Sequence, residues 1–263
     1  MGVLNVTPDS FSDGGRYEQL SRALDRAWEM VDEGAAIIDV GGESTRPGAV
    51  PVSIEEEIKR VAPVVNRLAA KLPIPLSVDT RHTEVMRRAL EAGASMINDV
   101  NALRDEGAIE VVAENDAAVC LMHMKGDPRT MQKAPEYKNV VDEVENFLLE
   151  RAELCEKSGI AKNRIVLDPG FGFGKKAKHN LRLMRSLPRL GAMGYPILVG
   201  VSRKSFIGEL MGGVPTEARL QGSVAAALYA AKSGARLIRA HDVRATREAL
   251  DVFWALSFGP ENE

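Results

Sequence analysis

The sequence is poor in cysteine, with only two among its 263 residues. Cys120 falls in an expected strand and Cys155 in an expected helix, so we interpret both as buried thiols rather than as a disulfide framework. Such thiols are typical of a reducing compartment, and we expect a cytoplasmic protein. No apolar run reaches the roughly 18 residues that a membrane-spanning helix needs, and the N-terminus shows no basic segment followed by an apolar core. We therefore expect no secretory signal and no membrane partner.

An excess of charge of one sign is also missing. The chain has 34 Lys and Arg against 37 Asp and Glu, for a formal net charge of -3. The basic residues are dispersed rather than gathered along one face, so we expect no nucleic-acid partner. Gly-Lys-Ser/Thr phosphate loops are absent as well. The glycine-rich stretch 170–174 is no dinucleotide fingerprint, because its third glycine comes one residue early and it follows the sixth expected strand.

What the sequence does contain is a series of eight short aliphatic runs that alternate with segments of helical periodicity. The runs cover residues 2–6, 36–40, 75–78, 95–97, 118–122, 164–167, 197–199 and 235–238. Strands that alternate with helices call for βαβ units and a parallel sheet. Eight such units without a linker favour closure, and the length is usual for an α/β barrel. We predict a single (β/α)8 TIM barrel domain over residues 1–263.

Polar or charged residues stand at or just past the C-terminal end of nearly every run. They are Asn5, Asp39, Asp79, Asn98 with Asp99, His123, Asp168, Ser202 with Lys204, and Arg239 with His241. Long loops leave the same strand ends, whereas the connections that enter the strands are tight glycine turns. Because active sites of (β/α)8 barrels are built at the C-terminal rim of the strands, we predict the active site there.

Seven composite motifs share these positions, over residues 1–15, 38–48, 77–80, 97–100, 122–126, 168–175 and 199–205. In this order they resemble the dihydropteroate synthase family of pterin-binding TIM barrels, over essentially the whole chain. The resemblance implies a transferase of folate biosynthesis that condenses 6-hydroxymethyl-7,8-dihydropterin diphosphate with 4-aminobenzoate to 7,8-dihydropteroate and diphosphate. The family usually carries a segment before the first strand. This sequence begins inside that strand, so we expect a barrel that lacks the segment.

The pterin ring presents adjacent N–H and amino donors flanked by nitrogen and carbonyl acceptors. A carboxylate can accept from the donor pair, and an amide or an ammonium group can serve the acceptors. The resemblance assigns these roles to polar residues from several strand ends and adds two apolar walls. The predicted pterin-binding residues are Asp79, Asn98, Asp168, Lys204, Met122 and Phe173.

The diphosphate requires positive charge. Arg239 and His241 are two residues apart after the last strand, so their side chains should face the same way and bind phosphate. We expect these two and Lys204 to be the catalytic residues, and the resemblance adds Thr45 to the diphosphate site. It also identifies Asn5 as a ligand of Mg²⁺, an ion usually held largely by substrate phosphate oxygens and water.

The second substrate, 4-aminobenzoate, carries a carboxylate and an amine that is already neutral near pH 7. The resemblance places it against Phe11, Thr45, Arg46, Pro47 and Ser205. Ser205 also lies near an expected helix start, where backbone N–H groups could bind the carboxylate.

Two alternatives remain open. A methyltetrahydrofolate:corrinoid methyltransferase-like barrel shares the pterin-edge residues but holds no diphosphate, so the Arg239 and His241 pair favours the synthase. An inactive binding paralogue should have lost some of Asp79, Asn98, Asp168, Lys204 or Arg239, all of which are present. The resemblance further suggests a homodimer formed through helices in the C-terminal half.

Overall fold

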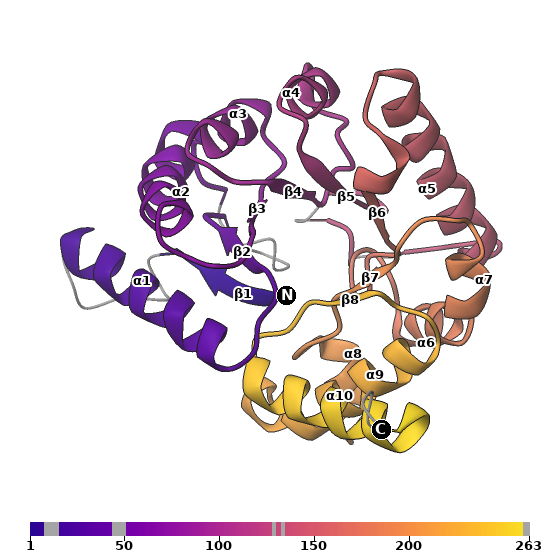
Figure 1. Cartoon of the computed structure of the whole chain (residues 1–263). Helices are drawn as coiled ribbons and strands as arrows, with labels where there is room; N and C mark the ends of the chain where they lie inside the picture. The colour runs from indigo at the N-terminus through magenta and orange to yellow at the C-terminus, as the bar shows by residue number, and fades with distance from the viewer. Residues whose placement is uncertain (8–15, 44–50, 128–129, 133–134, 260–263) are drawn as a thin grey trace.

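The structure, a computed structural model, describes residues 1–7, 16–43, 51–127, 130–132 and 135–259. Eight parallel strands form a ring at the centre of the molecule (Figure 1). They are β1 (Gly2–Asn5), β2 (Ile38–Gly41), β3 (Leu76–Asp79), β4 (Met96–Asp99), β5 (Ala118–Met122), β6 (Ile165–Asp168), β7 (Leu198–Val199) and β8 (Leu237–Ile238). β1 to β6 pair in chain order and β7 pairs with β8. Parallel bridges from Leu167 to Ile197 and from Gly2 to Ala240 close the ring.

Helices surround the ring on its outer side (Figure 1). They are α1 (Arg16–Asp32), α2 (Ile54–Ala69), α3 (Thr83–Glu91), α4 (Ala108–Glu114), α5 (Val140–Lys157), α6 (Ala177–Arg185), α7 (Leu187–Gly191), α8 (Ser205–Leu210), α9 (Leu220–Lys232) and α10 (Val243–Phe258). The described residues also include two 3₁₀ turns, Lys162–Arg164 and Thr216–Arg219. The predicted strand–helix alternation and the (β/α)8 barrel are therefore confirmed. In the described part of the chain, no helix is both long and apolar enough to cross a membrane.

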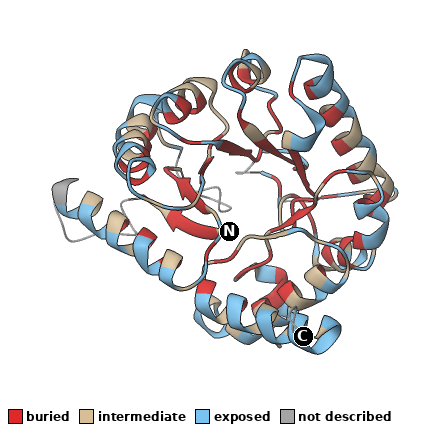
Figure 2. Cartoon of the chain, viewed as in Figure 1, coloured by how far each residue is buried: buried red, intermediate tan, exposed pale blue. Residues whose placement is uncertain are grey.

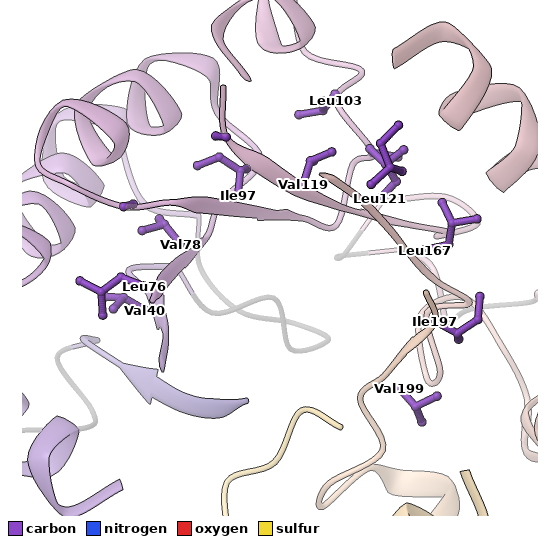
Figure 3. Close-up of a cluster of buried hydrophobic side chains, with 14 of the residues drawn as sticks. Val40, Leu76, Val78, Ile97, Leu103, Val119, Leu121, Leu167, Ile197 and Val199 are labelled. Carbon is purple, nitrogen blue, oxygen red and sulfur yellow. The ribbon is translucent and has the colours of Figure 1, made fainter. Parts of the chain in front are cut away.

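The strands alternate in the direction of their side chains, as parallel strands must. One set, including Val78, Ile97, Val119 and Leu167, lies on the outside of the ring and packs against the helices (Figure 3). Figure 2 shows the same division, with buried residues on the strands and on the ring-facing sides of the helices. This layer between strands and helices forms the main hydrophobic core.

The other set of side chains fills the inside of the barrel. Met96, Cys120, Val166 and Leu198 form a separate apolar cluster contributed by four successive strands, β4 to β7. Two residues further along the same strands, the inward positions become polar at Asn98 and Asp168. The apolar cluster therefore closes the interior beneath the polar residues of the C-terminal rim.

The same alternation decides which polar strand residues reach the interior. Asp99 follows Asn98 on β4 and so has the opposite direction. Its carboxylate accepts hydrogen bonds from the backbone N–H groups of Asn101 and Leu103, both at 2.6 Å. Asp99 thus shapes the turn after β4, while Asn98 is free to point toward the barrel axis.

Candidate active site

A pocket opens at the C-terminal rim of the strands, where the sequence predicted it. Its lining comes from the C-terminal ends of all eight strands and the segments just after them, and it includes charged, amide and aromatic groups. The lining residues are Val3, Asn5, Glu43, Asp79, Asn98, Val100, Met122, Asp168, Phe171, Phe173, Gly200, Ser202, Lys204, Arg239 and His241. All six residues predicted for the pterin are among them, together with Asn5, Arg239 and His241.

The residues predicted for 4-aminobenzoate are not placed in the same way. Phe11, Thr45, Arg46 and Pro47 lie outside the described residues, so the predictions for them stay predictions. Ser205 is the first residue of α8 and follows Lys204 directly, but it does not itself line the pocket within the part of the chain that the structure describes.

Arg239 is the centre of a network of ion pairs across the pocket floor. Its Nε donates to Oδ2 of Asp39 at 2.6 Å, and its Nη2 donates to Oδ2 of Asp79 at 2.8 Å. The Asn98 side-chain amide donates to the same Asp39 oxygen at 2.9 Å. Asp39, for which the sequence predicts no role, therefore connects a predicted phosphate-binding residue to a predicted pterin-binding residue.

The electrostatics of this network follow from its burial. Burial raises the pKa of Asp79 to about 7, although the Arg239 guanidinium acts in the opposite direction. For Arg239 burial works to lower the pKa, but the Asp39 and Asp79 carboxylates outweigh it and raise the pKa above its ordinary value. Arg239 is thus permanently charged, and its charge is shared between two acids.

Asp168, Phe173 and Lys204 form one wall of the pocket. The Asp168 Oδ1 accepts a hydrogen bond from the Gly170 N–H at 2.7 Å, and burial raises the pKa of Asp168 to about 6. The Lys204 Nζ lies 4.0 Å from the centre of the Phe173 ring, in cation–π contact. A carboxylate, an ammonium group and an aromatic face are therefore presented together, as the pterin prediction requires.

His241 lies in the pocket, and its surroundings decide whether its imidazole carries a charge. Its Nδ1 lies 3.1 Å from the Ser202 hydroxyl oxygen. Burial, together with the neighbouring Arg239, lowers the pKa of His241 to about 4. The imidazole is therefore neutral near pH 7. Of these two residues Arg239 carries the positive charge at that pH, and His241 can offer a hydrogen bond; the prediction that both bind the diphosphate stays a prediction.

Asn5 and Asp79 lie on either side of Gly41, and their oxygen atoms could hold a metal ion. In register, Asn5 on β1 lies beside Gly41 on β2, and Gly41 lies beside Asp79 on β3. A Cβ atom at Gly41 would lie 3.6 Å from the Asp79 Cβ and 3.8 Å from the Asn5 Oδ1. Glycine thus leaves a gap between an amide oxygen and a carboxylate, the oxygen ligands that Mg²⁺ prefers.

A second group of possible metal ligands consists of Glu43, Glu57 and His82, whose ligand atoms lie within 4.8 Å of one another. Arg81 donates to both carboxylate oxygens of Glu43, at 3.1 and 3.3 Å. His82 Nδ1 lies 2.9 Å from Glu57 Oε2, and this hydrogen bond raises the pKa of His82. Each acid of this group therefore already has a basic partner, Arg81 for Glu43 and His82 for Glu57.

Comparison with known proteins agrees with this geometry. Residues 1–241 match the family model described as pterin binding enzyme. The chain is 51% identical to the dihydropteroate synthase of Escherichia coli K12 over 263 residues, covering 100% of this chain and 93% of that protein. The chain belongs to the dihydropteroate synthase family. It is an enzyme, a transferase, and the methyltransferase alternative is set aside.

Two solved structures of this family are also similar. A dihydropteroate synthase of Xanthomonas albilineans with 4-aminobenzoic acid has a TM-score of 0.93 and 52% identity, covering 99% of this chain and 93% of that one. The Xanthomonas albilineans enzyme in complex with 7,8-dihydropteroate has a TM-score of 0.90 and 50% identity, covering 99% and 94%. These similarities extend over nearly the whole chain and confirm the predicted barrel fold.

Two acidic residues at the pocket of this family member, Asp39 beneath Arg239 and Glu43 in the lining, were not predicted as site residues from the sequence. Asp39 was recognised as polar but not as part of the site, although its position two residues before Gly41 on β2 gives it the same inward direction. Glu43 lines the pocket just after β2, and its carboxylate accepts a hydrogen bond from the Val52 N–H at 3.4 Å. Only the folded structure shows the contacts of Asp39 with Arg239 and of Glu43 with Val52.

Proposed function

We propose that the chain condenses 6-hydroxymethyl-7,8-dihydropterin diphosphate with 4-aminobenzoate, forming 7,8-dihydropteroate and diphosphate. The observation that carries this proposal is the convergence of Asp168, Asn98, Lys204 and Arg239 in one pocket. Family membership supports it, since the Xanthomonas albilineans structures contain 4-aminobenzoic acid and 7,8-dihydropteroate.

In the proposed complex the Asp168 carboxylate accepts from the adjacent N–H and amino groups of the pterin. Asn98 and Lys204 serve the ring nitrogen and carbonyl acceptors, while Met122 and Phe173 contact the ring. With a pKa of about 6, Asp168 is ionised at pH 7 although it is 6% exposed. An ionised carboxylate that is shielded from water is a strong acceptor, which supports its assignment to the donor pair.

The diphosphate is assigned to Arg239, His241 and Thr45, of which Thr45 lies outside the described residues. Arg239 already faces Asp39 and Asp79, so the floor of the pocket is negative when both acids are ionised. A further cation beside Arg239 would favour binding of an anionic leaving group there. Mg²⁺ held by Asn5 would supply it, and when bound it neutralises charge on the leaving diphosphate.

The reaction that these residues support is loss of diphosphate, aided by electron release from the dihydropterin ring, followed by attack of the amine on the exocyclic carbon. Arg239 and His241 hold the leaving group, and the pterin wall fixes the ring. The C–O bond breaks and a C–N bond forms. Because the aromatic amine is neutral at pH 7, its proton is released only after the C–N bond has formed, and no strong base is required.

The 4-aminobenzoate pocket is proposed at Phe11, Thr45, Arg46, Pro47 and Ser205. Ser205 supports this placement because it follows Lys204, which lines the pterin pocket. The second substrate would then lie next to the carbon that it attacks.

One assay tests this function directly. Diphosphate release should require both 4-aminobenzoate and Mg²⁺, and a sulfonamide should inhibit it competitively with 4-aminobenzoate. Release at the same rate without 4-aminobenzoate, or no release at all, would count against the proposed reaction and in favour of an inactive paralogue.

We also propose a homodimer formed through the C-terminal helices. α10 presents four large apolar side chains to solvent, Val252, Trp254, Leu256 and Phe258, which are 60%, 47%, 84% and 70% exposed. Leu256→Lys should convert the dimer to a monomer in light scattering. The matched control is Leu154→Lys on α5, which changes an exposed leucine outside this face and should leave the dimer intact.

We propose that residues 1–263 form one domain and that the protein is cytoplasmic. One hydrophobic cluster runs from Leu4 to Val243, which supports a single cooperative unit. Cys120 and Cys155 are both buried and free, which agrees with a reducing compartment. A single unfolding transition and cell fractionation test the two statements.

A further inference from the structure

The loop that follows β6 is built around a buried lysine, Lys175. This side chain is 3% exposed. Its Nζ lies 2.9 Å from Nδ1 of His123 and donates to the backbone carbonyl oxygens of His123, Gly170 and Phe173 at 3.1, 2.9 and 3.0 Å. An ammonium group has three donors, so Lys175 can satisfy three of these acceptors at once.

The loop held in this way carries one wall of the pterin pocket. Its residue Phe173 is the aromatic face beneath the Lys204 ammonium group. Its residue Gly170 donates the hydrogen bond that fixes the Asp168 carboxylate. Two of the carbonyl groups bound by Lys175 therefore belong to the two loop residues that contact the pterin-binding side chains.

Glycines allow the loop to lie close against the end of β5. Gly170 has a φ of +69°, and a Cβ there would lie 2.0 Å from the His123 carbonyl oxygen. Gly174 has a φ of +61°, and a Cβ there would lie 2.4 Å from the Lys125 carbonyl oxygen. Both positions exclude side chains for reasons of conformation and of space.

Two further side chains support the same loop. The Asn180 Oδ1 accepts from the Gly172 N–H at 2.9 Å, and the Tyr137 hydroxyl donates to the Gly174 carbonyl oxygen at 2.9 Å. Lys175 is nevertheless the costly member of the set, because a buried ammonium group loses its hydration. Burial lowers the pKa of Lys175 to about 7.

We propose that Lys175 is a positioning residue of the pterin site, which sets the shape of the 169–175 loop with the help of Tyr137. Lys175 is not among the residues that line the pocket in the described part of the chain, so it acts through Phe173 and Asp168. This inference rests on the proposed assignment of the pocket to the pterin.

The test is titration calorimetry of the full-length protein with 6-hydroxymethylpterin as the probe, because calorimetry reports the dissociation constant and the number of sites separately. Lys175→Met leaves the loop carbonyl groups without their donors. Loss of one or two such hydrogen bonds should raise the dissociation constant on the order of tenfold, with an unchanged number of sites. A purely structural role would instead lower the number of sites and leave the dissociation constant unchanged, which would overturn the proposal.

Lys178→Met is the matched control, because Lys178 lies exposed on α6 and carries the same charge. It should bind the probe as the wild type does, and a tenfold loss in this variant too would overturn the proposal. If Lys175→Met yields no folded protein, Tyr137→Phe decides, since it removes one hydroxyl and keeps the ring. It should weaken binding by roughly threefold, and unchanged affinity would overturn the proposal. Failure of the wild type to bind the probe would instead contradict the assignment of the pocket to the pterin.

Discussion

Asp168 offers a test in which stability and function change in opposite directions. Burial raises its pKa from 3.8 to about 6, so the folded protein holds a carboxylate that would be easier to ionise in the unfolded chain. Because each pKa unit corresponds to about 1.4 kcal/mol, this ionisation costs about 3 kcal/mol of the free energy of unfolding well above pH 6. The stability that the raised pKa provides is fully present below pH 3.8 and is lost as the pH rises through 6.

Asp168→Asn removes this ionisation while keeping an oxygen that can accept from the Gly170 N–H. The new amide donor costs about 1 kcal/mol if it finds no partner, and that cost does not depend on pH. The difference in free energy of unfolding between variant and wild type should therefore shift by about 1.5 kcal/mol in favour of the variant from pH 5 to pH 8. Comparison at two pH values cancels the contributions of all groups that the two proteins share.

Urea unfolding of both proteins at pH 5 and pH 8 measures this shift. Activity should change the other way, because an amide cannot accept from both pterin donors. Loss of a hydrogen bond to a charged group should lower kcat/KM for the pterin diphosphate on the order of 100-fold at pH 8. A stability difference that is the same at both pH values would refute the reasoning from burial, and near wild-type activity would refute the role in pterin binding.

Three further predictions concern the diphosphate site, the Mg²⁺ site and the pH dependence of pterin binding. Arg239→Ala should lower turnover by on the order of 100-fold or more while circular dichroism still shows a folded barrel; wild-type kinetics would remove the phosphate site. Gly41→Ala places a methyl group between Asn5 and Asp79 at ordinary contact distances, so the fold should persist while the Mg²⁺ concentration needed for half-maximal rate increases; an unchanged requirement would place the ion elsewhere. Binding of 6-hydroxymethylpterin should weaken as the pH falls below about 6, where Asp168 becomes protonated. This pH dependence should be absent in Asp168→Asn.

The fold could be predicted from the sequence because its signals are local. Eight aliphatic runs that alternate with segments of helical periodicity favour a barrel, and the glycine turns mark the side on which strands begin. The turn glycines at 34, 93, 159 and 234 indeed have positive φ angles between +90° and +107°. The position of the active site at the C-terminal rim could be predicted from the same information, because the C-terminal ends of the parallel strands of a barrel lie together.

The contacts within the site could not be predicted in this way. The ion pair between Arg239 and Asp39 joins residues 200 positions apart, so no local sequence pattern predicts it. The neutral state of His241 depends on burial by the completed barrel. Lys175 stands at the end of a glycine-rich stretch, but only the folded loop shows that its ammonium group is enclosed by carbonyl oxygens.

A crystal structure with 6-hydroxymethyl-7,8-dihydropterin diphosphate bound tests the central claim most directly. The pterin donors should lie within hydrogen-bonding distance of the Asp168 carboxylate, with Lys204 on the same ring and the diphosphate next to Arg239. A ring bound outside this rim, or a diphosphate that does not approach Arg239, would contradict it.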